Sequence, residues 1–235
     1  MAEPLYALAA APRDQVHVPT LTRDQGVRQF LEQPPYARYE GWNLVTLERA
    51  DLRSGPRLHI QNGRRKFIDL VADGTLTAIG TFDGFLGWGR WEFAQRPKVN
   101  GLAVVEFTHE FVSFYERLLH EYVEPIPDGV RFSVGVRNAH YEHEGEERKL
   151  YLSPGPIGDL YDLDEYNRRE APSPAFTEAL DVETSAEEPH LDVGAVSYQL
   201  LRRFYNWFGF TDDAVPYTNQ AHDSIDFAQI QNMRR

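Results

Sequence analysis

The stretch "RRKFIDLVADGTLTAIGTF", residues 64–82, predicts a β-hairpin and with it the class of the fold. Phe67, Asp69 and Val71 alternate with Ile68 and Leu70, which is the two-residue period of a strand with two different faces. Asp73-Gly74 then supplies a two-residue turn of the kind that hairpins favour. Because "PRLHI" (56–60) precedes this hairpin as another short strand, we expect an antiparallel meander of at least three strands.

The remaining elements follow from the same two periodicities. Helical spacing of apolar residues predicts helices over about 22–33, 100–123 and 193–208, the first of them bounded by Thr22 and by Pro34-Pro35. Further strands are predicted over 4–12, about 42–48, 129–141 and 148–152. Helices therefore arrive singly among antiparallel strands. This order favours an α+β fold, an antiparallel sheet meander with three main helices packed on it.

Acidic charge is concentrated in one region of the chain. Residues 159–192 carry eleven acidic residues and two arginines, a net of −9, whereas the whole chain of 235 residues has a net charge of −12. Together with its prolines, this charge predicts a partly ordered loop or linker. We therefore expect an α+β core over 1–158, an acidic loop or linker over 159–192, and a C-terminal helix and tail over 193–235 that pack on the core.

Composition excludes several classes of function. The chain has no cysteine, so it contains no disulfide, no thiolate metal site and no cysteine nucleophile. No apolar run approaches the ~20 residues that a membrane-spanning helix needs, and the N-terminal stretch does not read as a signal peptide. We expect a cytoplasmic protein with no membrane partner.

One stretch has more of the character of a site than any other: "GTFDGFLGWGRWEF", residues 80–93. Its glycine order, G-x-x-G-x-G, differs from the dinucleotide pattern G-x-G-x-x-G, and strand-like residues follow it, so we reject binding of a nucleotide phosphate. Two hypotheses remain. The stretch is either an edge hairpin whose Trp88, Trp91 and Phe93 pack on the core, or an exposed surface on which Trp88 and Trp91 flank Arg90 and stack on a base or another planar ligand.

The one basic cluster lies in "NGRRKF", residues 62–67. Arg64, Arg65 and Lys66 are candidates for contacts with phosphate groups, because clustered cations on one face are the electrostatic footprint of nucleic-acid binding. Two arginines of the predicted 129–141 strand would extend this basic surface if the faces of the strands align. The alternative is a solvated end of a hairpin.

The stretch "NAHYEHEGEE", residues 138–147, contains candidate metal ligands. Imidazole combined with carboxylate suits zinc or manganese, so His140 and His143 would be the ligands of a metal-dependent hydrolase or nuclease. The alternative is a polar hairpin tip whose charges stay in solvent, and in that case we expect no cofactor.

The helix "AVSYQLLRRFYNWFGF", residues 195–210, is apolar on more than one side. Such a helix is either buried in the core or serves as an interface between subunits. The second alternative would make the protein a structural assembly subunit that forms an oligomer through residues 195–210.

Several segments together carry a family resemblance. They are "PPYARYEGW" (34–42), the "DGTLTAIG" hairpin, the helix "NGLAVVEFTHEFVSFYERLL", and the helix "LLRRFYNWFG" followed by "VPY". In this combination, spread over residues 4–217, the chain resembles the region that follows the AlbA-2 domain in bacterial ATP-binding proteins of the Schlafen AlbA-2 group. The AlbA-2 domain itself is absent from these residues, so no functional residue carries over. The resemblance implies an accessory or recognition domain in a prokaryotic regulatory or anti-phage defence setting.

The leading expectation is therefore a non-catalytic recognition and regulatory module whose partner is an effector protein or nucleic acid. Its expected contact residues are Trp88, Arg90 and Trp91, with the basic cluster as support for phosphate contacts. The metal-dependent enzyme and the structural assembly subunit are the alternatives.

Overall fold

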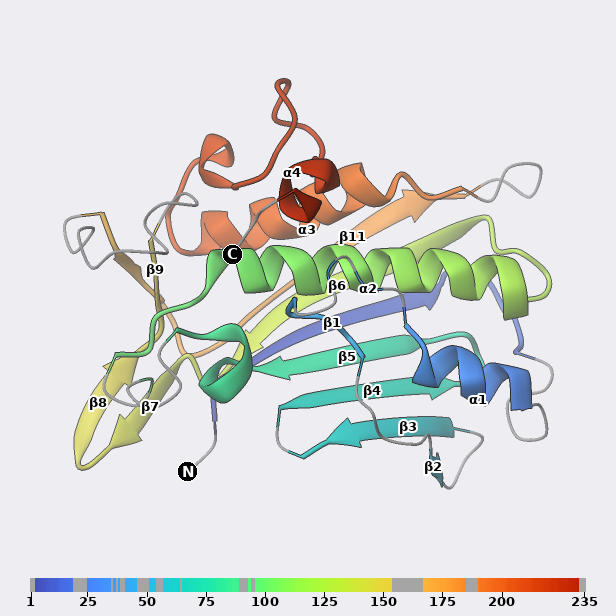
Figure 1. The fold of residues 1–235 in the computed structure, drawn as a ribbon, viewed down its shortest axis with the longest axis horizontal. Helices are drawn as coiled ribbons and strands as arrows, with labels where there is room; N and C mark the ends of the chain where they lie inside the picture. Colours follow the sequence, from blue (N-terminus) through green and yellow to red (C-terminus); the bar gives the residue numbers. More distant parts are fainter. Residues whose placement is uncertain are drawn as a thin grey trace.

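A seven-stranded antiparallel sheet forms the centre of the structure (Figure 1). The computed structural model describes residues 3–18, 25–34, 36, 38, 41–45, 51–53, 57–63, 65–88, 93, 96–153, 167–184 and 190–232. The strand order is β11-β6-β1-β5-β4-β3-β2. The strands are β1 (Leu5–Pro12), β2 (Asp51–Arg53), β3 (Arg57–Asn62), β4 (Lys66–Val71), β5 (Leu76–Thr81), β6 (Gly129–Arg137) and β11 (Phe176–Glu183). The α+β class predicted from the sequence is confirmed.

The hairpin that decides the fold lies between β4 and β5. Its loop holds three residues, 72–74, and not the predicted two, because the Val71 amide donates to the Thr75 carbonyl (2.9 Å). Gly74 closes the loop at φ +80°, a left-handed conformation that glycine adopts without a steric penalty. The rest of the meander, from β2 to β5, follows the order of the sequence.

The helices are α1 (Gln25–Glu32), α2 (Gly101–Tyr122), α3 (Val193–Trp207) and the short α4 (Phe227–Gln231). The first three are those that the apolar spacing predicts. The side chains of Asn100 and Asp192 cap α2 and α3. Each accepts a hydrogen bond from the backbone N–H three residues later in the chain, as polar N-cap residues do. The predicted cap of α1, Thr22, lies outside the described residues. No helix in the described ranges is long and apolar enough to cross a membrane.

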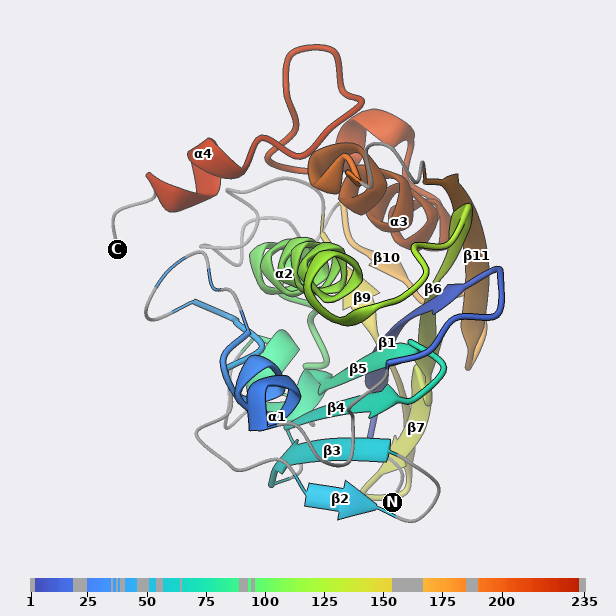
Figure 2. The same ribbon diagram turned by 90° about the vertical axis from the view of Figure 1, so that its right-hand side faces the viewer.

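All three long helices cover the same face of the sheet. Figure 2 shows α1, α2 and α3 on one side of it and no described helix on the other. The core lies between the layers, where the ring of Tyr6 from β1 meets Phe107 of α2 and Phe204 of α3 edge to face. The Tyr6 hydroxyl is paired with Thr108 at 2.9 Å, so the largest polar group of this contact is satisfied.

The edge hairpin predicted over 80–93 needs correction at residues 82–86, which form a turn and not a strand, whereas residues 89–92 lie outside the described residues. Residues Phe82–Leu86 form a single wide turn closed by a bond from the Gly87 amide to the Phe82 carbonyl (2.7 Å). Gly84 adopts φ +73° inside the turn. A Cβ at Gly87 would overlap the ring of Phe93, which is buried. The glycines therefore serve a tight turn and a close approach of the backbone to an aromatic ring.

Two further predictions need correction. Residues 41–45 of the strand predicted at about 42–48 are not in a strand, because side-chain oxygens of α2 hold their backbone amides. The acidic loop or linker predicted over 159–192 contains β11, which pairs with β6 along its full length. Apolar side chains of β11 that face the helices alternate with exposed polar ones, so an edge strand buries enough surface to be ordered despite its charge.

The chain between β6 and β11 forms two small sheets. β7 (His140–His143) pairs with β8 (Glu146–Lys149), and β9 (Tyr151–Leu152) pairs with β10 (Arg169–Glu170). The predicted 129–141 and 148–152 strands are thus each divided between two strands. A 3₁₀ turn at Asp212–Ala214 follows α3.

Candidate functional site

Of the three residues proposed as a stacking surface, Trp88 belongs to the described residues, whereas Arg90 and Trp91 lie outside them. Trp88 is half-buried, and its backbone N–H donates to the Lys98 carbonyl at 2.9 Å. Its indole N–H is buried and has no hydrogen-bond partner in the described part of the chain. A stacking platform needs an exposed ring face, and the partly buried Trp88 keeps that role as a prediction only.

The basic cluster divides between the two sides of the sheet. Arg64 lies outside the described residues, and Arg65 is exposed. Lys66 points inward, where its ammonium group donates to the carbonyls of Asn43 (2.8 Å) and Val45. Burial lowers the pKa of Lys66 to about 8. Because its donors are used inside the protein, Lys66 does not face a phosphate group, and the predicted role is corrected.

The proposed metal ligands His140 and His143 lie three residues apart on β7 and therefore on opposite faces of the strand. The Nε2 atom of His140 is bonded to the Ala171 carbonyl at 2.8 Å. His143 lies 4.0 Å from the carboxylate of Glu144, its neighbour in sequence. A shallow depression of about 430 Å³ is lined by His140, Tyr141, Glu142, Gly145 and Glu147 and not by His143. The two imidazoles do not converge on one point.

Helix α3, the proposed oligomer interface, packs inside the protein. Its apolar side chains are buried against α2 and the sheet, among them Leu200, Leu201 and Phe204. Tyr36 is the one large hydrophobic residue of the described ranges that is exposed. Residues 195–210 therefore present no exposed apolar patch that could serve as an oligomer interface, and the helix belongs to the core.

Two buried carboxylates on α2 are the next candidates for chemistry. Glu106 and Glu110 are 0% and 2% exposed and lie one helical turn apart. Their oxygens accept backbone N–H bonds from Trp42 (2.8 Å) and Leu44 (3.0 Å). Because these bonds satisfy the carboxylates from the chain itself, the pair fixes residues 41–45 on α2 and is not poised for acid–base work.

The face of the sheet opposite the helices has no cover of described helices (Figure 2). The pairing register aligns residues from four strands there, and all of them except Ile79 are small. One row runs Thr177, Gly135, Ala7 and Ile79, and the next runs Ala179, Ser133, Ala9 and Thr77. Most of these residues are partly or fully exposed, while their neighbours on β1, Tyr6 and Leu8, are fully buried on the helix side. The result is a sheet surface with mostly short side chains at its centre.

Ion pairs lie around this open sheet face. Arg131 binds Asp181 through two bonds of 2.8 and 3.0 Å, and Arg13 binds Glu183 at 2.7 Å. The bond from Arg131 lowers the pKa of the Asp181 carboxyl. On the same face, towards the other edge of the sheet, Arg57 lies 3.3 Å from Asp69. Burial raises the pKa of Asp69, and Arg57 partly lowers it again.

Two arginines on the same face lack such partners. Arg65 and Arg137 are exposed and form no ion pair within the described part of the chain. They lie at the two ends of a row of neighbouring residues that crosses β6, β1, β5 and the start of β4. The row consists of Arg137, Leu5, Thr81 and Arg65. Of the basic sheet surface considered from the sequence, Arg131 is paired with a carboxylate, Arg65 and Arg137 are the described arginines without one, and Arg64 and Arg90 lie outside the described residues.

The open sheet face escaped the sequence analysis, although one signal for it exists. In "LYALAAAP" alanine occupies three successive positions that face away from the core, Ala7, Ala9 and Ala11, where an exposed strand normally carries longer polar side chains. No family model, no curated protein and no solved structure shows a significant match to the chain.

Proposed function

We propose that this chain is a non-catalytic recognition module that binds a partner protein through the open sheet face and thereby regulates an effector. The observation that supports the proposal most is the double row of short side chains across β11, β6, β1 and β5. Short side chains let a second surface approach the backbone closely, and a flat apolar centre with a polar rim is the usual anatomy of a protein interface.

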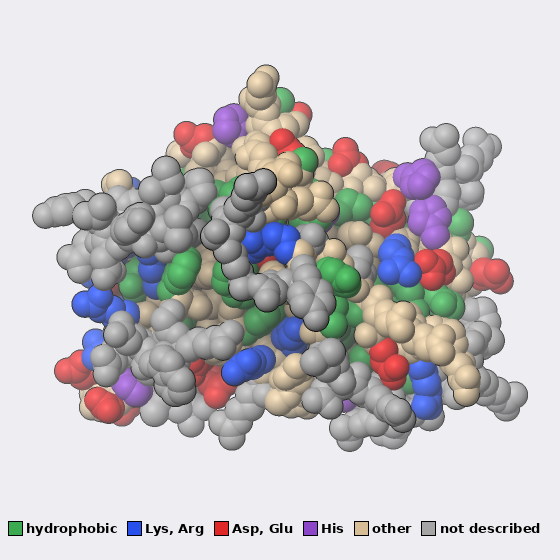
Figure 3. All heavy atoms as spheres, in the orientation of Figure 1, with side chains coloured by type: hydrophobic (Ala, Val, Ile, Leu, Met, Phe, Trp, Pro, Cys, Tyr) green, Lys and Arg blue, Asp and Glu red, His purple; other side chains and the backbone are tan. Residues whose placement is uncertain are grey.

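Charge favours a protein over a nucleic acid as the partner. Nucleic-acid affinity comes largely from unpaired cations that displace counterions from phosphates. Among the described residues of this face, Arg13, Arg57 and Arg131 are paired with carboxylates, and Arg65 and Arg137 are not. Figure 3 views the opposite side, where acidic and basic side chains are interspersed among the described residues. The net charge of −12 adds long-range repulsion.

The regulatory setting rests on the resemblance to the region that follows the AlbA-2 domain. That resemblance supports an accessory role in a prokaryotic regulatory or anti-phage defence system, in which the partner is the effector or a protein that controls it. A module of this kind needs a surface and not a catalytic centre. Glu106, Glu110 and His140, which were considered above for chemistry, are bonded within their own chain.

Site-specific photo-crosslinking tests the proposal. A benzophenone amino acid replaces Ala179 at the exposed edge of the open sheet face, and a matched variant carries it at exposed Ala228 on α4. We expect one host protein to be trapped by the Ala179 probe and not by the Ala228 probe. Equal trapping at both positions would contradict the proposal.

A binding assay distinguishes the nucleic-acid alternative. Fluorescence anisotropy with single- and double-stranded oligonucleotides at low salt should show no saturable binding. Saturable binding that weakens with salt and is lost in the Arg65→Ala, Arg137→Ala double variant would replace the protein partner with a nucleic acid.

A further inference from the structure

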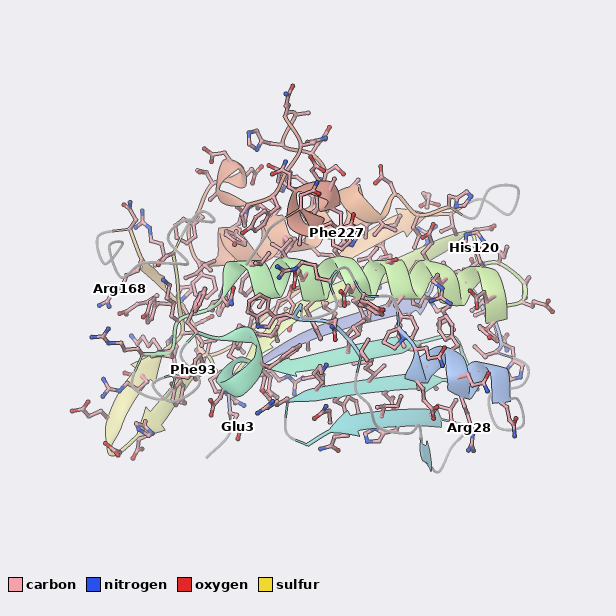
Figure 4. The ribbon with its side chains drawn as sticks, viewed as in Figure 1. Glu3, Arg28, Phe93, His120, Arg168 and Phe227 are labelled. Atoms are coloured by element: carbon pink, nitrogen blue, oxygen red, sulfur yellow. The ribbon has the colours of Figure 1, made fainter. Side chains whose placement is uncertain are left out.

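A cluster of three metal-ligating side chains lies at the C-terminal end of α2, away from the open sheet face. Glu116 and His120 come from the last turns of this helix, and His190 comes from the segment that leads into α3. Figure 4 labels His120 at this end of α2, and Figure 3 shows histidine side chains gathered beside acidic ones on the same part of the surface.

The three side chains converge. The Nδ1 atom of His190 lies 3.3 Å from Oε1 of Glu116, and the rings of His120 and His190 are 5.0 Å apart. One ligand atom from each residue lies within 4.8 Å of the other two. Ligand atoms of a tetrahedral zinc site are roughly 3.3 Å apart, as follows from zinc–nitrogen bonds of about 2.0 Å. Small rotations of exposed side chains would close the remaining difference.

The fold positions these ligands independently of any ion. Glu116 and His120 are four residues apart on a regular helix, so their side chains share one face. Buried Leu191 anchors the residue after His190, and Asp192 caps α3 through a bond of 2.9 Å to the Ala195 amide. The backbone on the C-terminal side of His190 is thereby fixed against α2 through the packing of α3 on that helix.

The donor set indicates the chemical class of the ion. Two imidazoles and one carboxylate are the protein ligands of several zinc centres, whereas magnesium and calcium prefer oxygen ligands alone. His120 and His190 are exposed, and Glu116 is half-buried. Water can therefore complete the coordination at the fourth position.

We infer that Glu116, His120 and His190 bind one zinc ion that joins the end of α2 to the segment leading into α3. Such a clip links residues about 70 positions apart in sequence, and it stabilises the folded chain by binding the folded state only. The site does not depend on the proposed partner or on the open sheet face. Its exposure means that a chelator removes the ion without unfolding the protein.

Zinc titration of the chelator-treated full chain tests the inference. Isothermal calorimetry with zinc chloride should give one saturable site per chain, and magnesium chloride should give none. At zinc about 100-fold above the dissociation constant, the melting temperature should rise by about 5–10 °C. Failure to bind zinc stoichiometrically would overturn the inference.

Substitutions assign the site. His190→Ala and His120→Ala should each weaken zinc binding by about 100-fold or more, since even indirect supports of a metal site are worth roughly 10–100-fold. The matched control, His143→Ala, removes a histidine outside the cluster and should bind zinc as the parent chain does. Zinc binding that survives both cluster variants, or that is lost in the control, would also overturn the inference.

A conservative replacement separates ligation from folding. The chain has no cysteine, so His190→Cys introduces a single thiol at a position whose side chain is 75% exposed. The variant should retain metal binding and show thiolate-to-cobalt absorption when cobalt(II) is added. Absence of that band in a variant with an unchanged melting temperature would contradict ligation at this position.

Discussion

Arg38 and Glu106, 68 residues apart in sequence, form a largely buried ion pair in which the Arg38 Nε donates to Glu106 Oε1 at 2.6 Å. The other oxygen of Glu106 accepts the Trp42 amide, and a Cβ at Gly41 would lie only 2.8 Å from it. Three residues of the "RYEGW" motif thus depend on one carboxylate of α2. These contacts join residues 38–42 to α2.

Glu106→Gln should lower the free energy of unfolding by about 3 kcal/mol, because it leaves the Arg38 guanidinium without its partner in a largely buried position. Urea denaturation measures the loss. Glu121→Gln on the same helix is the matched control, since the Arg117–Glu121 pair is exposed on both sides and should be worth about 0.5 kcal/mol or less. Similar losses of unfolding free energy in the two variants would show that the Arg38–Glu106 pair contributes no more than a surface ion pair.

The lowered pKa of Lys66 predicts that the free energy of unfolding rises with pH in the alkaline range. Its folded pKa of about 8 lies below the ordinary value of 10.5 because of burial, so between pH 8 and 10.5 the unfolded chain binds more protons than the folded one. Stability from this group is therefore greatest above about 10.5 and is lost as pH falls through 8. Urea denaturation over this range should show a positive slope in the parent chain relative to Lys66→Met. Parallel pH profiles would contradict the shift.

His109 predicts a loss of stability in acid. Its ring stacks on the ring of Phe227 of α4, with the ring centroids 3.9 Å apart and an angle of 4° between the ring planes. Figure 4 shows Phe227 over α2. Burial lowers the pKa of His109 to about 4, so the unfolded chain takes up a proton between pH 6.5 and 4 before the folded chain does. This stability is complete above about 6.5 and is lost as pH falls towards 4.

Limited proteolysis between pH 7 and pH 4.5 checks this consequence with an acid-tolerant protease. Cleavage between α3 and α4 should accelerate as the pH falls, because a charged His109 no longer tolerates its buried contact with Phe227. His109→Phe should lose most of this acceleration. Equal acceleration of cleavage in the parent chain and in His109→Phe would show that His109 does not cause the loss of stability.

Periodicity predicted most of the elements, because the burial of one face imposes it. Val130, Phe132, Val134 and Val136 of β6 are all buried, as their alternation requires, and α2 begins and ends within one residue of its predicted bounds. The errors lie where other forces decide. Residues 41–45 are shaped by distant carboxylates, and β11 is ordered by its pairing with β6.

The candidate sites were less predictable than the fold, because they combine distant segments. Glu116 and His120 are visible as a helical pair, but His190 joins them only through the packing of α3 on α2. The open sheet face requires the strand order, which places β1 between β5 and β6. An alternating sequence shows that a strand has two faces and does not show which strands lie beside it.

The affinity of the photo-trapped partner for two arginine variants tests the central claim most directly. Ala179→Arg places a long charged side chain on the open sheet face, whereas Ala228→Arg places the same side chain on exposed α4. Calorimetric titration should show a dissociation constant about tenfold larger, or more, for Ala179→Arg, since an unpaired charge in an interface costs more than about 1.4 kcal/mol. Ala228→Arg should bind as the parent chain does. Equal affinity of both variants would contradict a role for the open sheet face in recognition.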